Sequence, residues 1–177
     1  MSNIPLVDEN NNLLGHGDKT LVHEKGLLHR AFSLFVFDSK KRLYIQKRAD
    51  EKYHCPGLWS NTSCSHPEAN IIKKREIANN LYRELGMNCG RIIHLYDFIY
   101  KKEFVNGLIE HELDSVYLSF SNEKANMNPL EVSMIQQVPM KRLYNEISEK
   151  PNKYTFWFKE IIGDERFKES LKKFGLL

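Results

Sequence analysis

Carboxylates occupy alternate positions in residues 109–118, which read IEHELDSVYL. Because successive side chains of a strand point to opposite faces, Glu110, Glu112 and Asp114 share one face and His111 lies on the other. Buried neighbouring carboxylates repel each other unless a metal ion or a proton compensates their charge. Taken alone, this pattern favours an exposed acidic strand edge over a metal or acid–base site.

Histidines add a second kind of metal ligand. His23 and His29 flank Gly26, and His66 lies in the segment NTSCSHP. Imidazole and carboxylate together suit Zn²⁺, Mn²⁺ or Fe²⁺. A set of three histidines and two glutamates is compatible with the sequence, but spacing does not define it. Each histidine alone favours an ordinary surface or core position.

Cys64 is the third chemical candidate. It stands two residues before His66 and near the start of an expected helix, and both features tend to lower the pKa of a thiol. A buried structural cysteine is an equally good interpretation. The chain has three cysteines, an odd number that indicates free thiols rather than a disulfide framework.

Basic and aromatic side chains are candidates for contacts with an anionic substrate. Arg48 and Lys52 bracket the start of a loop, and Lys19 lies upstream, so together the three could clamp a phosphate. Trp157, in YTFWFKE, could stabilise a cation with its indole face or could anchor the last helix. Taken individually, each basic residue is better interpreted as a solvated surface charge, and Trp157 is better interpreted as a core residue.

Hydrophobic periodicity predicts the elements that must position these residues. Residues 31–38 are apolar on both faces and predict a buried strand, which forms a hairpin with the alternating strand 42–48. An irregular loop is expected at 49–66. A helix is expected at 67–85, with Ser65 as its N-cap and Ile71 in its apolar stripe.

The rest of the chain alternates strands with helices. Strands are expected at 91–101, 109–120 and 133–138, and helices at 140–149 and 155–174. This mixture predicts an α/β or α+β sandwich in which helices pack on a mixed sheet, with residues 1–177 forming one domain.

Composition excludes several classes of protein. The net charge of +3 is too small to indicate nucleic-acid binding, and no apolar run is long enough to span a membrane. The N-terminus lacks a basic start followed by an apolar run, which argues against a signal peptide. We therefore expect a cytoplasmic protein without nucleic-acid or membrane partners.

Taken together, these segments resemble the type I isopentenyl-diphosphate isomerase family, which has a Nudix-like α/β/α sandwich with a mixed sheet. The resemblance runs in order from about Lys19 to Trp157 and covers most of the chain. The NT-C-HP and E-x-E motifs are specific, whereas RELG alone is weak. The matching pieces are GLLHRAFSLFVF, QKR, PGLW-NTSCSHP, RELG, the region of Tyr100, IEHE and TFWF.

The resemblance implies a role for each matched position. Isopentenyl diphosphate would be converted to dimethylallyl diphosphate by protonation and deprotonation through a carbocation. The implied catalytic residues are Cys64 on one face of the substrate and Glu112, assisted by Tyr100, on the other. The implied ligands of one divalent metal (Mn²⁺, Zn²⁺ or Mg²⁺) are His23, His29, His66, Glu110 and Glu112.

The resemblance also implies how substrate is held. Glu84 would bind a second Mg²⁺ that accompanies the diphosphate. The implied partner is a small prenyl diphosphate, and the protein would be a monomer or weak homodimer. The implied substrate-binding residues are Lys19, Arg48, Lys52 and Trp157.

The sequence departs from the family at Asn80, where an arginine that helps to hold the diphosphate is usual. Candidates for a shifted contact are Lys73, Lys74, Arg75 and Arg83. Phe156 also stands where a proline is common. These departures bear on substrate affinity more than on the type of reaction.

Two other functions fit a Nudix-like fold. A pyrophosphohydrolase would need carboxylates that gather Mg²⁺ to activate water. The sequence motif of such enzymes, G-x5-E-x7-R-E-U-x-E-E-x-G-U with U an aliphatic residue, is mostly lost. Its Gly, Glu, Arg and Glu positions, and the first position of its Glu-Glu pair, hold in order Ser65, Ile71, Asn79, Asn80 and Arg83. A non-catalytic metal-binding relative would have no need of Cys64, Glu112 and Tyr100 together.

Overall fold

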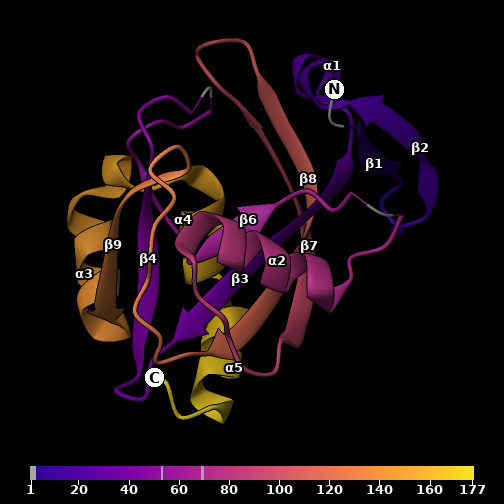
Figure 1. The fold of residues 1–177 in the computed structure, drawn as a ribbon. Coiled ribbons are helices and arrows are strands. Elements are labelled where there is room, and N and C mark those ends of the chain that lie inside the picture. Colours follow the sequence, from indigo (N-terminus) through magenta and orange to yellow (C-terminus); the bar gives the residue numbers. More distant parts are fainter. Residues whose placement is uncertain (1–2, 53, 69) are drawn as a thin grey trace.

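The computed structural model describes residues 3–52, 54–68 and 70–177. Within them, nine strands form one curled sheet with helices on both faces (Figure 1). The strands are β1 (Asn3–Val7), β2 (Leu13–Asp18), β3 (His29–Phe37), β4 (Arg42–Arg48), β5 (Trp59–Ser60), β6 (Ser63–Ser65), β7 (Ile93–Glu103), β8 (Ile109–Phe120) and β9 (Val132–Pro139). The helices are α1 (Lys19–Lys25), α2 (Lys74–Leu85), α3 (Met140–Glu149), α4 (Phe156–Gly163) and α5 (Glu165–Lys173), with a 3₁₀ turn, η1 (Pro151–Lys153).

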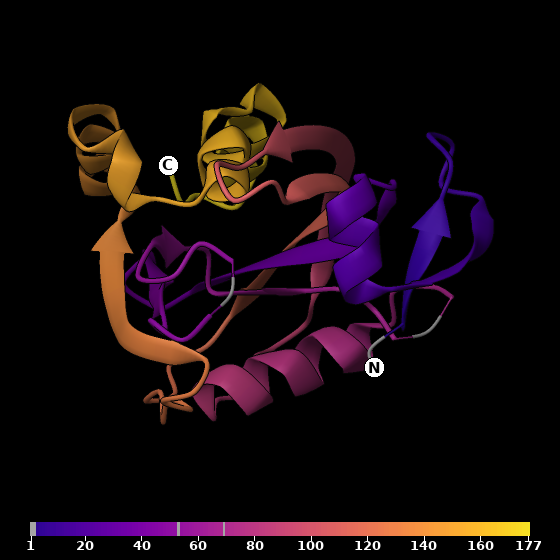
Figure 2. The same ribbon diagram turned by 90° about the horizontal axis from the view of Figure 1, so that it is seen from above.

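Helices cover the sheet from opposite sides, as the view from above shows (Figure 2). The helix α2 lies on one face, and α4 and α5 lie on the other. Central strand β3 is buried along its whole length and pairs in parallel with β8, while β8 pairs antiparallel with β7. The sheet is therefore mixed, and the expected α/β/α sandwich is confirmed.

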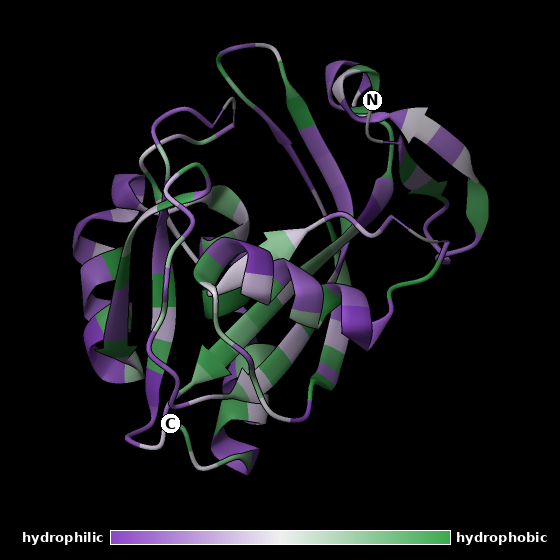
Figure 3. Cartoon of the chain, viewed as in Figure 1, coloured by the Kyte–Doolittle hydropathy of each residue, from purple (hydrophilic) through white to green (hydrophobic). Residues whose placement is uncertain are grey.

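The two faces of β3 build two separate cores. Phe35 and Phe37 pack toward α4 and α5, and the ring of Phe35 lies 4.6 Å from that of Phe167. Phe32 and Leu34 pack toward α2 on the other face. The second half of β3 is accordingly hydrophobic, whereas α2 alternates hydrophobic and hydrophilic residues (Figure 3). Helix and sheet are thus held by apolar burial on both sides.

The predicted hairpin of β3 and β4 exists, but its strands separate soon after the turn. The two strands pair at Phe37 and Leu43. Beyond that point β6 pairs with β3, and β5 pairs with β4. The segment 49–66, expected to be an irregular loop, therefore contains two short strands inserted between the arms of the hairpin. Side chains between separated strands can line a cavity without breaking the core.

Two helix predictions were wrong at their boundaries. Helix α2 begins at Lys74 rather than at residue 67, its N-cap position is Lys73 rather than Ser65, and Ile71 is 61% exposed instead of buried. Without an apolar stripe on the core, the first expected turn does not form. The helix expected at 155–174 is two helices, because Asp164 ends α4 and its side chain caps α5 by accepting from the backbone N–H of Arg166.

Several predicted elements were confirmed. Strands β7 and β8 fall within two residues of the expected ranges, and their connection turns at Gly107, which has a φ of +80°. Strand β9 leads into α3 as expected. The elements β1, β2 and α1 were not predicted. In the part of the chain that the structure describes, no helix is both long and apolar enough to cross a membrane.

Candidate active site and metal centre

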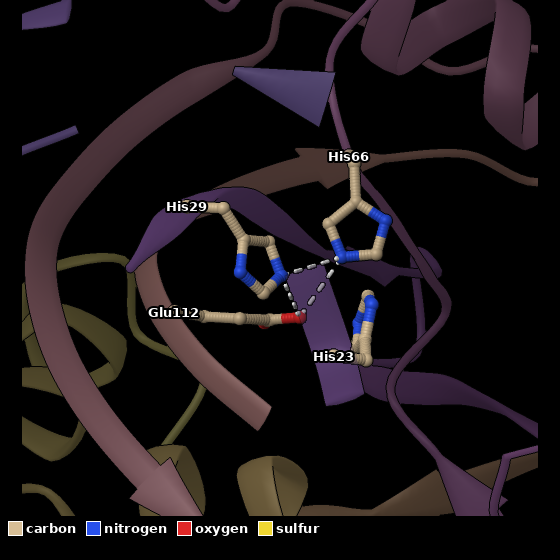
Figure 4. A group of neighbouring side chains, drawn as sticks. All are labelled: His23, His29, His66 and Glu112. Carbon is tan, nitrogen blue, oxygen red and sulfur yellow. Dashed lines mark hydrogen bonds and ion pairs between the residues drawn. The ribbon is translucent and has the colours of Figure 1, made fainter. Parts of the chain in front are cut away.

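Three histidines and one carboxylate converge at the end of β3 (Figure 4). His23, His29, His66 and Glu112 each offer one ligand atom, and these atoms lie within 4.8 Å of one another. Glu112 Oε1 is 3.0 Å from His66 Nε2 and 3.5 Å from His29 Nε2. The four residues come from four chain segments, a convergence that sequence spacing did not define.

Local structure places each of these ligands. Asp18 caps α1 by accepting from the backbone N–H groups of Thr20 and Leu21, and this helix carries His23 inward. Gly26 ends α1 in the left-handed region with a φ of +60°, which turns the chain back toward His29. Parallel register then sets His29 directly beside Glu112.

Hydrogen bonds at the far side of two rings fix their orientation. His23 Nδ1 lies 2.6 Å from the carbonyl of Lys19, and His29 Nδ1 lies 2.8 Å from the carbonyl of Leu27. A carbonyl only accepts, so each Nδ1 carries a proton, and Nε2 presents a lone pair when the ring is neutral.

The facing ring nitrogens fit a divalent cation. His29 Nε2 and His66 Nε2 are 3.2 Å apart, a contact that repels if both present lone pairs and that a cation or a shared proton relieves. Burial lowers the pKa of His23 to about 4 and the pKa of His66 to about 3, so both rings are neutral at pH 7. Neutral imidazoles beside an ionised carboxylate are the form that metals bind.

The two oxygens of Glu112 face different partners. Oε1 faces the histidines, whereas Oε2 lies 2.7 Å from the Tyr100 hydroxyl. Burial alone would raise the pKa of Glu112, but the hydrogen bonds from His29 and His66 outweigh it and hold the pKa well below its usual value. One carboxylate can thus contact a metal through one oxygen and exchange a proton through the other.

Tyr100 joins Glu112 to Glu110. The Tyr100 hydroxyl also lies 2.7 Å from Glu110 Oε2, although it has only one proton to donate. Burial, and then the charge of Glu112, raise the pKa of Glu110, so a proton shared within this group is favoured on Glu110 over Glu112. Burial also raises the pKa of Tyr100 well above its usual value, so the phenol stays neutral.

A cavity of about 320 Å³ opens beside this cluster. It brings together ten of the twelve predicted site residues, and the other two, His29 and Tyr100, contact its wall through Glu112. The predicted residues on its wall are Lys19, His23, Arg48, Lys52, Cys64, His66, Glu84, Glu110, Glu112 and Trp157.

Basic side chains line the cavity alongside its carboxylates. Burial, and then the charge of Lys52, lower the pKa of Lys19. Lys52 is paired with Glu131, and Arg48 donates to the backbone carbonyl of His54 at 2.8 and 3.1 Å. Cations crowded in this way favour an anionic ligand.

Curated relatives of high coverage share one name. Isopentenyl-diphosphate Delta-isomerase 2 of Aromatoleum aromaticum is 41% identical over 152 residues, which are 86% of this chain and 80% of that protein. Isopentenyl-diphosphate Delta-isomerase 2 of Photorhabdus laumondii is 40% identical over 158 residues, 89% of each chain. The chain belongs to the isopentenyl-diphosphate Delta-isomerase family. No family model matches the chain.

Solved structures show that this isomerase has the Nudix fold. The MutT protein of Methanosarcina mazei superposes with a TM-score of 0.63 at 13% identity, over 82% of this chain and 96% of that one. The NUDIX domain of Shewanella oneidensis NrtR gives a TM-score of 0.60 at 13% identity, over 81% and 87%. The expected family, fold and class of enzyme are confirmed.

Cys64 lines the cavity, and of the two interpretations of this residue the pKa follows the buried cysteine. It stands opposite Ser33 of β3 and lines the cavity. Burial raises the pKa of the Cys64 thiol to about 12, against the lowering that its neighbours in sequence favour. The helix thought to begin nearby starts only at Lys74, so desolvation dominates.

The remaining predicted residues lie at other walls of the isomerase cavity. Glu84 accepts from Gln46 Nε2 at 3.1 Å and Ser63 Oγ at 3.0 Å, and burial raises its pKa. Trp157 is 5% exposed and donates from Nε1 to Ser60 Oγ at 3.1 Å. Glu110 is not among the four convergent ligands, so its role as a fifth ligand stays a prediction.

Sequence reasoning missed two residues near the site. His54 lines the cavity, and no motif in the sequence surrounds it or gives it a role. Asp114 is 1% exposed and accepts a hydrogen bond from Ser33 Oγ at 2.8 Å. The alternation of residues 109–118 placed Asp114 on the acidic face, but nothing in it distinguished that carboxyl from Glu112.

Proposed function

We propose that this chain converts isopentenyl diphosphate to dimethylallyl diphosphate, with Cys64 and Glu112 as its acid and base groups and Tyr100 assisting Glu112. The observation that carries the proposal is that both groups line one cavity, together with the cationic side chains and Trp157. A binding protein has no need of proton-transfer groups from two different strands in one cavity. An isomerase that moves a double bond needs one to add a proton and one to remove a proton.

The proton would enter from the side of Glu112 and Tyr100. The forward reaction would start from the form of the site in which Glu112 carries a proton and Cys64 is a thiolate. Oε2 of Glu112, hydrogen-bonded to Tyr100, would then deliver its proton to the terminal alkene carbon, and the electron pair of the double bond would form the new C–H bond. The adjoining carbon becomes a tertiary cation. Trp157, buried beside the cavity, stabilises positive charge with its ring and cannot trap it covalently, as a nucleophile would.

The second proton would leave to Cys64. The thiolate accepts a proton from the carbon next to the cation, and the electrons of that C–H bond form the new double bond. A high pKa makes the thiolate a strong base once formed, and the same thiol is the acid in the reverse direction. Bound substrate would have to displace water from the cavity, because water would capture the cation.

The histidine cluster fits one divalent metal, and we propose Mn²⁺, Zn²⁺ or Mg²⁺ as its occupant. The proposed ligands are His23, His29, His66 and Glu112, with Glu110 as a fifth. A bound cation would supply Lewis acidity that holds Glu112 in place and makes it a better proton donor. Neutral imidazoles and the lowered pKa of Glu112 support this assignment.

The diphosphate would lie among Lys19, Arg48 and Lys52. Their convergence on one cavity supports this assignment. We further propose that Glu84 binds a second Mg²⁺ that accompanies the diphosphate, because its carboxyl faces the same cavity. Neutralising the diphosphate would keep it bound and prevent it from leaving during the reaction.

Asn80 stands where an arginine that helps to hold the diphosphate is usual, and we propose that Arg83 makes this contact instead. Of the four candidates for a shifted contact, it is the one that lines the cavity. Its guanidinium contacts Asn80 Oδ1, and Asn80 Nδ2 donates to Ser63 Oγ at 2.7 Å. Since Asn80 is neutral, this tether orients the guanidinium without cancelling its charge, and Ser63 links it to Glu84.

The domain organisation, the oligomeric state and the location of the protein can also be proposed. We propose a single domain over residues 1–177, a monomeric or weakly dimeric state and a cytoplasmic location. Size-exclusion chromatography with light scattering tests the assembly, and limited proteolysis tests the domain. A stable tetramer, or two fragments that each fold alone, would contradict them.

Proton NMR of isopentenyl diphosphate in D₂O, with enzyme and Mg²⁺, tests the function directly. Deuterium should enter the methyl group of the product as the vinyl signal disappears. Release of phosphate with no change in the alkene would instead indicate a hydrolase. Binding of substrate with neither change would indicate a non-catalytic relative.

A further inference from the structure

His54 connects the two sides of the cavity. It is 4% exposed and belongs to the segment between β4 and β5. Arg48 holds its backbone by donating two hydrogen bonds to its carbonyl oxygen. The position of the ring is thus set by a residue that itself lines the cavity.

On one side the ring contacts the acidic network. His54 Nε2 lies 2.5 Å from Glu110 Oε1, and the other oxygen of Glu110 contacts Tyr100, which contacts Glu112. A carboxylate held at both oxygens cannot rotate freely. The contact with His54 therefore limits the orientation of Glu110 and, through Tyr100, that of Glu112.

On the other side the ring packs on aromatic side chains. The rings of His54 and Trp157 are nearly parallel, with centroids 6.2 Å apart and an interplanar angle of 5°. The ring of Phe104 meets His54 edge-on, at 4.5 Å and 76°. Offset parallel and edge-to-face contacts are both favourable, so His54 restricts the tilt of the indole.

We infer that His54 is a positioning residue, which sets the Trp157 indole and the Glu110–Tyr100–Glu112 network relative to each other. This inference rests on the proposed function, in which the indole faces a cation and Glu112 transfers a proton. Misplacing reacting groups by about 1 Å can cost on the order of 100-fold in rate. His54 would thus affect turnover without touching the substrate.

Two substitutions separate the two contacts. His54→Phe keeps a ring beside Trp157 but removes the nitrogen that faces Glu110, whereas His54→Asn keeps a polar atom and loses the ring. Both variants should lower kcat about tenfold or more and change KM less than about threefold. The matched control is His94→Phe, at a half-exposed histidine that pairs with Asp97 away from the cavity, and it should keep both constants.

A second measurement does not depend on activity. The indole N–H of Trp157 donates to Ser60 Oγ, and its hydrogen exchange can be followed by NMR after Trp59→Phe assigns the two indole signals. The rate of hydrogen exchange of the Trp157 indole N–H should rise about tenfold in His54→Asn and stay unchanged in His54→Phe.

The outcomes are distinct. Wild-type kcat in either variant, or unchanged indole exchange in His54→Asn, would overturn the inference. If the wild-type protein does not isomerise the substrate, the proposed function fails, yet the exchange measurement still decides whether His54 positions Trp157. If His54→Asn does not fold, His54→Gln takes its place.

Discussion

At the scale of single residues, environment decides chemistry more than residue type does. Glu110 and Glu112 are two residues apart on one strand, yet burial raises the pKa of one while two histidines lower that of the other. Cys64 shows the same principle, because its burial raised a pKa that its neighbours in sequence indicated would fall. Identical side chains thus acquire different pKa values from the groups that face them.

Cys64→Ala should bind metal normally and lose isomerisation by a factor of about 10² to 10⁴, the usual contribution of a proton-transfer group. The measurement is the initial rate of dimethylallyl diphosphate formation, with metal content determined in parallel. Cys89→Ala is the control, since Cys89 is also partly buried but packs against the other core. Unchanged turnover in Cys64→Ala would show that the thiol carries no proton.

Arg83→Gln should raise KM for isopentenyl diphosphate about tenfold, because a charge-assisted contact contributes roughly 1.5–3 kcal/mol and the exposure of this residue places the effect at the lower end. Steady-state kinetics checks this, and kcat should change little. Arg75→Gln, on the same helix but away from the cavity wall, is the control. Adding Asn80→Arg to the variant should restore KM. An unchanged KM in Arg83→Gln would exclude the relocated contact.

At the scale of elements, the site depends on how strands and turns present side chains. The parallel register of β3 and β8 brings His29 beside Glu112. The short helix α1 brings in His23, and the turn at Gly26 connects that helix to β3. The separation of β3 from β4 leaves room for the cavity and for β6, which carries Cys64. The metal cluster is therefore sensitive to backbone changes that touch no ligand.

Gly26→Ala should destabilise the fold by about 1–2 kcal/mol or more and weaken metal binding. Its φ is +60°, and an added Cβ would lie 2.8 Å from the side chain of Ile109. Chemical denaturation and metal titration measure the two effects. Gly107→Ala has a positive φ but no atom within 4 Å, so it should cost less stability and leave metal affinity unchanged. Equal effects of both substitutions would refute the role of the turn.

At the scale of the whole molecule, the metal cluster joins elements that lie far apart in sequence. Its four residues come from α1, β3, the segment after β6, and β8. A ligand that binds only the folded chain stabilises all the contacts on which its site depends. Occupancy of the cluster should therefore be measurable in global unfolding as well as in activity.

Removing metal with a chelator should lower Tm by several degrees and abolish isomerisation. Free metal at about 100 times its Kd contributes about 2.7 kcal/mol to folding. Calorimetry of chelated and reloaded protein measures the effect, and His66→Ala should make Tm insensitive to the chelator. An identical Tm with and without metal, in protein that retains bound metal before chelation, would contradict the assignment.

The metal-free protein should lose stability as pH falls from about 6.5 toward 4. Burial lowers the pKa of His23 to about 4 and of His66 to about 3, so at these two positions the unfolded chain binds more protons than the folded chain in this range. The contribution of the two neutral imidazoles to the free energy of unfolding is complete above the pKa of histidine in the unfolded chain, and it declines as the pH falls toward the folded values. Thermal melts of chelated protein from pH 7 to 4 measure it. His23→Gln should make Tm depend less steeply on pH. An unaltered slope of Tm against pH would show that His23 is not buried as a neutral imidazole.

The sequence by itself determined much of the local structure. The apolar run of β3, the alternation of β8 and the turn at Gly107 predicted the strands correctly, and the faces of Glu110 and His111 followed from strand geometry. Periodicity and turn chemistry depend on neighbouring residues, so one chain is enough to reveal them. Resemblance to a family then supplied candidate roles that no spacing contained.

Only the tertiary structure decided which groups meet. The convergence of His23, His29 and His66 on Glu112, the late start of α2, and the contacts of His54 all depend on packing between distant segments. Distances between such segments are set by how apolar faces fit together, and burial in turn sets the pKa values of the groups enclosed. Those quantities belong to the assembled fold and have no counterpart in local sequence.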